Sequence, residues 1–129
     1  MNWSGLERRK FPRVNYPCMI VIRHGHTAEP QALLTHTENV GIGGVCVVLK
    51  NAIKLFTTVE VELDLMDTTH NIKCAGRVVW SVQRRSSEKA KPAFYDTGIE
   101  FVNLSANDQK HIEATVARLV KAGQEAPYK

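Results

Sequence analysis

The sequence predicts an all-β fold, a six-stranded antiparallel β-barrel followed by a single C-terminal α-helix. Six short segments either are rich in β-branched residues or alternate between apolar and polar side chains, and turn-forming residues separate them. Only near the C-terminus do apolar residues recur at helical spacing. With 129 residues, 43% of them hydrophobic and 23% charged, the chain has the length and composition of one globular domain.

The expected strands follow one another between residues 18 and 102. They span residues 18–23, 32–38, 45–49, 59–65, 71–82 and 95–102. The fourth, VEVELDL, alternates most clearly and predicts one buried and one solvated face. Gly76, inside the fifth strand, predicts a bulge or a bend.

The two ends of the chain differ from this pattern. Residues 1–17 contain Pro12 and Pro17 and little apolar period, so we expect a basic N-terminal arm there, with the barrel over residues 18–104. Ser105 and Asp108 form a capping-box pattern that predicts a helical segment at 105–122, with the helix from about 106 to 121 covering one open end of the barrel. Gly123 is expected near its end, and 123–129 form a tail.

The net charge of +4 is concentrated near the N-terminus. Four basic residues and one acidic residue in Glu7–Arg13 account for +3 of it. A nucleic-acid-binding face would spread basic residues over several elements, so this pattern favours a grip on something small and highly charged. A second basic group, at Arg84, Arg85, Lys89 and Lys91, is interpreted as a solvated hairpin tip.

The residues that could support catalysis or metal binding are scattered. No serine lies in a nucleophile-elbow pattern, and His24 and His26 would need His36 or His70 from a distant loop to hold a metal. We therefore expect neither an enzyme nor a metal or cofactor site, and we interpret these histidines as exposed turn residues. Cys18, Cys46 and Cys74 are odd in number and lie in apolar stretches, which favours buried free thiols.

Two features of the sequence predict where in the cell the protein is located. No apolar run approaches the ~18–20 residues that a membrane-spanning helix needs. The N-terminus MNWSGLERRK lacks the apolar core of a secretion signal. We expect a cytoplasmic protein without membrane insertion.

Two short motifs are suited to binding an anion. Arg9 and Arg13 form R-x-x-x-R, and arginine offers planar paired donors that match phosphate oxygens and can stack on a purine. Asn39–Gly44 reads N-x-G-x-x-G, in which glycines permit close backbone approach and the Asn39 amide can read a base edge. Each motif alone is weak, since basic tails and glycine-rich turns without a ligand are common.

Taken together, these residues resemble the PilZ domain, the bacterial receptor module for cyclic di-GMP. That family has R-x-x-x-R in an N-terminal arm and [D/N]-x-S-x-x-G about 20–35 residues later. Here Arg9–Arg13 has the first motif, and Asn39–Gly44 is similar to the second. GRVVW at 76–80 and TGIEFVNLS at 97–105 are similar to later segments of the family. The resemblance covers roughly residues 7–120.

The resemblance implies a set of ligand-binding residues. They are Arg8, Arg9, Arg13, Asn39, Gly41, Gly44 and Trp80. Arg9 and Arg13 would hold phosphates and guanine, Asn39 would bond a guanine edge, and Gly44 would allow close approach. Arg8 is similar to an arginine that stacks on guanine in some members, often those that bind an intercalated ligand dimer. Trp80 is similar to an aromatic residue that packs on the base in some members.

One position departs from the family pattern. Gly41 stands where the family has serine, so a hydroxyl that could bond the ligand is missing. If the hydroxyl was used, its loss costs about 1–2 kcal/mol, or about tenfold in affinity.

The resemblance implies a receptor that binds cyclic di-GMP, orders its N-terminal arm and signals to a separate effector protein, which the sequence does not identify. Two alternatives remain open. One is a degenerate PilZ domain that binds only protein. The other is a small basic barrel that binds single-stranded nucleic acid, against which the chain offers only nine aromatic residues. We expect no DNA partner.

Overall fold

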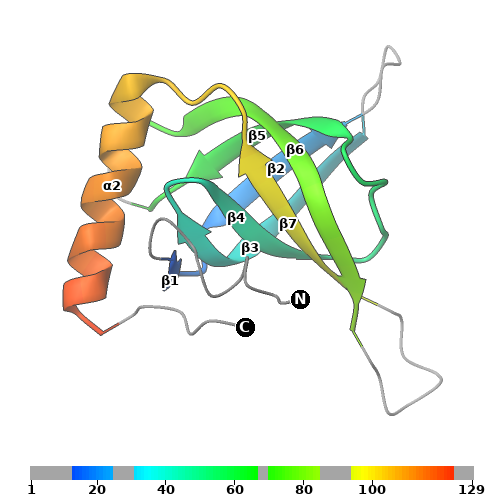
Figure 1. Ribbon diagram of the computed structural model, residues 1–129, viewed down its shortest axis with the longest axis horizontal. Helices are drawn as coiled ribbons and strands as arrows, with labels where there is room; N and C mark the ends of the chain where they lie inside the picture. Colours follow the sequence, from blue (N-terminus) through cyan, green and yellow to red (C-terminus); the bar gives the residue numbers. More distant parts are fainter. Residues whose placement is uncertain (1–12, 25–30, 67–69, 85–93, 124–129) are drawn as a thin grey trace, which may run out of the picture.

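The computed structural model describes residues 13–24, 31–66, 70–84 and 94–123, and within them the chain forms seven strands and one helix (Figure 1). The elements are β1 (Arg13–Asn15), β2 (Met19–His24), β3 (Gln31–Gly41), β4 (Gly44–Leu49), β5 (Thr58–Asp64), β6 (Ile72–Gln83), β7 (Tyr95–Phe101) and α2 (Ala106–Lys121).

The strands β2 to β7 close into an antiparallel barrel. The order in the sheet is β1-β3-β2-β5-β6-β7-β4, and pairing of β3 with β4 completes the circle. The predicted six-stranded barrel with a C-terminal helix is therefore confirmed. A seventh strand, β1, pairs with the end of β3, so that residues 13–15, which the sequence placed in the arm, belong to the sheet.

The barrel interior is filled by alternate side chains of its strands. In β5, Val59, Val61 and Leu63 are buried, whereas the residues between them are wholly or partly exposed, as the alternation predicted. Burial of each such side chain contributes about 1.5–3 kcal/mol to folding. Gly76 in β6 points into this interior, because a β-carbon there would lie 2.7 Å from Cγ2 of Ile99.

Helix α2 lies along one end of the barrel (Figure 1) and contacts β1 and β3. Its first turn is capped by Ser105, whose Oγ accepts a hydrogen bond from the backbone nitrogen of Asp108 at 3.1 Å. Ile112, Val116 and Leu119 pack against the core. The helix bounds agree with the sequence prediction, and Gly123 follows at a positive φ of 83°.

Two further expectations concern cysteines and membrane spans. All three cysteines are free, Cys18 and Cys46 buried and Cys74 partly buried, which confirms the thiol interpretation. Within the described ranges, no helix has both the length and the apolar character needed to cross a bilayer.

The barrel contains two register shifts, and neither is at Gly76, which pairs directly with Phe101. One lies in β3 between Thr37 and Asn39, and the other in β6 between Val78 and Trp80. The sequence predicted a bulge or a bend at Gly76, but the bulge in β6 lies three residues later, at Val79. Gly76 instead allows close packing of side chains in the core.

Candidate functional site

Four residues from four strands form one row across the outside of the barrel. Asn39 in β3 pairs with Cys46 in β4, Cys46 with Gly98 in β7, and Gly98 with Trp80 in β6. Directly opposed residues of antiparallel strands point to the same face. The neighbouring row, Val40, Val45, Ile99 and Val78, is buried in the core, so the row that contains Asn39 and Trp80 faces outward.

Strand β1 brings Arg13 to this row. Arg13 lies opposite Gly41, and its Nη1 donates a hydrogen bond to Oδ1 of Asn39 at 3.3 Å. Both side chains are half-buried. The second arginine of R-x-x-x-R thus touches the first residue of N-x-G-x-x-G.

Trp80 lies directly over Gly98. A β-carbon at residue 98 would overlap Nε1 and Cε2 of the indole and lie 2.7 Å from its Cδ1. The pyrrole part of the ring therefore covers the backbone of β7, with one face against Gly98 and the other directed away from the sheet. Half-buried in this way, Trp80 offers an aromatic surface suited to stacking on a base. Gly98 is a site residue that sequence reasoning did not assign, although an unexplained glycine inside a strand was a signal for it.

A network of charged groups borders the row. Arg84 donates from Nη2 to Oε2 of Glu38 at 2.9 Å and from Nε to Oδ1 of Asp96 at 2.8 Å. Sγ of Cys46 donates to Oε1 of Glu38 at 3.7 Å. The sequence placed Arg84 in a solvated basic patch and assigned no role to either carboxylate, because these residues come together only through strand pairing.

The electrostatics of the row follow from this network. Burial and the hydrogen bond with Asp96 raise the pKa of Glu38, and Arg84 opposes the shift. Burial, followed by the fields of Glu38 and Asp96, raises the pKa of Cys46 to about 12, whereas Arg13 lowers it. The Cys46 thiol is therefore protonated at neutral pH.

The remaining predicted site residues divide into three groups. Arg8 and Arg9 lie outside the described residues. Gly41 is buried at the end of β3, opposite Arg13, rather than in a free turn. Gly44 begins β4 so close to β7 that a β-carbon would overlap the carbonyl oxygen of Ile99. The packing of β4 against β7 therefore requires a glycine here, whether or not a ligand binds.

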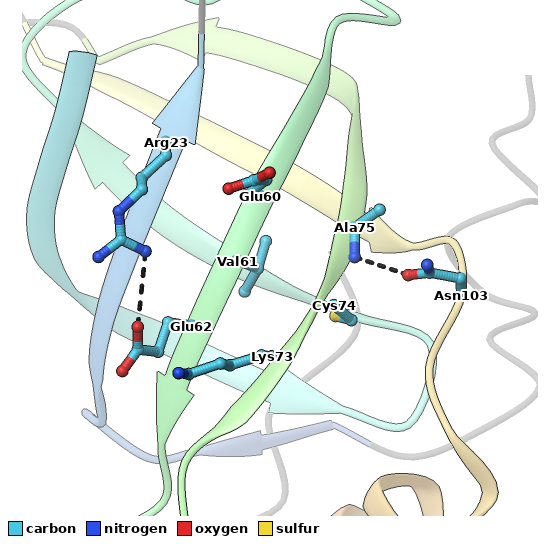
Figure 2. Close-up of a pocket in the computed structure, with 8 residues that line it drawn as sticks. All are labelled: Arg23, Glu60, Val61, Glu62, Lys73, Cys74, Ala75 and Asn103. Atoms are coloured by element: carbon cyan, nitrogen blue, oxygen red, sulfur yellow. Dashed lines mark hydrogen bonds and ion pairs between the residues drawn. The ribbon is translucent and has the colours of Figure 1, made fainter. Parts of the chain in front are cut away.

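A hollow of about 610 Å³ lies on the outer face of β2, β5 and β6 (Figure 2). It is lined by Arg23, Glu60, Val61, Glu62, Lys73, Cys74, Ala75 and Asn103. Figure 2 shows Arg23 turned toward Glu62, and their closest atoms are 3.5 Å apart. Two carboxylates, Glu60 and Glu62, and two cationic side chains, Arg23 and Lys73, line this hollow, so its charges balance. Among the described residues no three His, Cys, Asp or Glu side chains are grouped so that they could hold a metal ion.

The amino-acid sequence was compared with known protein families and with curated proteins. The sequence matches the PilZ domain family over residues 7–118. No curated protein matches the chain.

Solved structures share the fold. The PilZ domain with c-di-GMP of YcgR from Escherichia coli matches with a TM-score of 0.65 at 13% identity, over 90% of this chain and 94% of that one. The inhibitor of motility MotI of Bacillus subtilis matches with a TM-score of 0.69 at 18% identity, over 89% and 52%. The K. pneumonia MrkH–c-di-GMP complex matches with a TM-score of 0.70 at 17% identity, over 90% and 54%.

The chain thus spans about half of MotI and of MrkH, and nearly all of the isolated YcgR domain. At these identities the likeness establishes the barrel and its terminal helix. The match of the sequence itself covers most of the chain and includes both motifs whose residues meet at Arg13 and Asn39. The chain belongs to the PilZ domain family.

Proposed function

We propose that the chain is a receptor for cyclic di-GMP and that the ligand binds on the outer row formed by Asn39, Cys46, Gly98 and Trp80. The observation that supports this most directly is the contact of Arg13 with Asn39 in a row that ends at an outward-facing indole. Cyclic di-GMP has two phosphates and two guanines. The site offers a guanidinium for phosphate, an amide for a base edge and an aromatic face for stacking.

The comparisons support the ligand class. YcgR and MrkH are described in complex with c-di-GMP, and the chain shares their fold. Arg8 and Arg9 would complete the arginine clamp from the N-terminal side, around one ligand or an intercalated pair. A change in the arm on binding would alter the surface offered to a separate effector protein, which is the proposed signal.

Isothermal titration calorimetry of the full chain with cyclic di-GMP at moderate salt tests the proposal. We expect micromolar or tighter binding, and a loss of about tenfold or more in Arg13→Ala and in Asn39→Ala, because hydrogen bonds to charged groups contribute about 1.5–3 kcal/mol. Arg23→Ala is the matched control, since Arg23 is also a half-buried arginine paired with an outer-face partner.

Two results would overturn the proposal. One is an absence of heat with cyclic di-GMP together with salt-sensitive binding of a short single-stranded oligonucleotide, which would indicate a nucleic-acid-binding barrel. The other is a loss of affinity in Arg23→Ala but not in Arg13→Ala, which would place the ligand in the hollow of Figure 2.

A further inference from the structure

The register shift in β3 places Glu38 directly before Asn39. Thr37 pairs with Val47 and Asn39 with Cys46, which leaves Glu38 as the extra residue of a β-bulge. Bulged residues lose part of their ladder pairing, so their orientation depends on side-chain contacts. Glu38 accepts hydrogen bonds from Cys46 in β4 and from Arg84, which directly follows β6.

Arg84 holds Glu38 and Asp96 at the same time. Its Nη2 and Nε reach the two carboxylates at 2.9 and 2.8 Å, and all three side chains are only partly exposed. The two contacts fix the guanidinium in one plane and tie β3, β6 and β7 together on the outer face. The chain of contacts ends one residue from Asn39.

The same network sets the charge beside the proposed ligand site. Asp96 lies two residues from Gly98 along β7, and Glu38 adjoins Asn39 in the chain. An anionic ligand on the row would meet both carboxylates. The single positive charge of Arg84 offsets much of their combined negative charge at close range, so that repulsion of a phosphate is reduced.

Resting on the proposed function, we propose that Arg84 is a positioning residue of the nucleotide site: it fixes the Glu38 bulge that presents Asn39 and screens the Glu38–Asp96 pair from the anionic ligand. This assigns a role on the receptor face to a residue that directly follows β6 and lies outside both sequence motifs.

The test compares Arg84→Gln with Arg77→Gln by calorimetry with cyclic di-GMP on the full chain. Arg77 is a matched control because it lies in β6, the strand that Arg84 directly follows, has similar side-chain exposure and pairs with one carboxylate, Glu100, at 2.7 Å. We expect Arg84→Gln to weaken binding about tenfold at pH 7.5, and Arg77→Gln to change it less than about twofold.

A charge-neutral variant and a pH series separate screening from direct ligand contact. Adding Glu38→Gln and Asp96→Asn to Arg84→Gln removes the charge repulsion and should restore the affinity to within about threefold of the parent. The remaining loss is the effect of the bulge that Arg84 no longer holds. In Arg84→Gln alone, the affinity should recover as the pH falls, because Glu38, whose pKa is raised by burial, then takes up a proton. The groups that face this pair are Arg84, Cys46 and, through Cys46, Arg13. Equal losses in the two arginine variants, or a triple variant as weak as Arg84→Gln, would overturn the proposal.

A measurement without ligand distinguishes failure of this inference from failure of the proposed function. Backbone amide NMR shifts of Asn39 and Gly41 should change in Arg84→Gln and stay unchanged in Arg77→Gln, whether or not cyclic di-GMP binds. If the parent chain binds no cyclic di-GMP but these shifts change, the proposed function fails and the positioning of the bulge stands. If the shifts of the two variants do not differ, Arg84 does not position Asn39.

Discussion

The contact of Trp80 with Gly98 leads to a prediction that depends on one methyl group. In Gly98→Ala, the new β-carbon would overlap two atoms of the indole and lie 2.7 Å from a third. Non-bonded carbon atoms pack at about 3.5–4.0 Å, so the ring must move outward by about 1 Å. Overpacking of a well-packed site costs about 1–3 kcal/mol. Because Trp80 lies on the outer face and can move toward solvent, we expect about 1 kcal/mol, or roughly 4 °C in Tm.

The displaced ring should also weaken stacking. Stacking of one base on an aromatic side chain contributes about 1–3 kcal/mol, so a loss of about 1 kcal/mol raises the Kd for cyclic di-GMP about fivefold. Thermal unfolding gives the stability, and fluorescence in a Trp3→Phe background, where Trp80 is the sole tryptophan, gives the position of the ring. The emission should shift to the red as the ring becomes more exposed.

The control is Gly43→Ala, since a β-carbon at residue 43 meets no atom within 4 Å. We expect it to change stability by less than about 0.5 kcal/mol and to leave the emission unchanged. If Gly98→Ala equals Gly43→Ala in both Tm and emission, Trp80 does not rest on Gly98, and the inferred stacking surface is wrong.

Three further predictions concern neighbouring positions. Gly41→Ser should tighten cyclic di-GMP binding up to about tenfold in calorimetry, because residue 41 lies opposite Arg13; unchanged affinity would show that the ligand does not reach it. Gly44→Ala should lower the free energy of unfolding in urea by about 1–3 kcal/mol, since its β-carbon would overlap backbone of Ile99; a neutral result would contradict that contact. Burial raises the pKa of Cys46 from 9.0 to about 12 and that of Cys74 to about 11, so the unfolded chain releases these protons first. Stability should therefore fall as the pH rises from about 9 to 12, less steeply in a Cys46→Ala variant.

Local patterns in the sequence predicted most of the fold. Helix α2 could be placed because Ser105 and the apolar spacing that follows it are local signals, and β5 because its alternation is strict. Strand β1 could not, since three residues are too few to show a period and their pairing partner is the distant end of β3.

The same distinction applies to the site. Arg13 and Asn39 could be predicted because each lies in a short motif, and the structure brings the two together. The contact between Arg84 and Glu38 joins residues 46 positions apart, and no spacing rule relates them. Such a pair depends on the register of four strands, which the order of residues in any one strand does not show.

The two register shifts explain why Asn39 and Trp80 face outward at all. In an unbroken strand, side chains alternate, so with Thr37 and Val78 directed inward, residues 39 and 80 would also point into the core. The extra residue at each bulge, Glu38 in β3 and Val79 in β6, reverses the alternation. Both predicted ligand residues therefore follow a bulge immediately, on opposite sides of the same row. Bulges are frequent beside functional sites because they redirect a side chain without breaking the sheet, and here two of them turn a polar amide and an indole out of the barrel and onto one face.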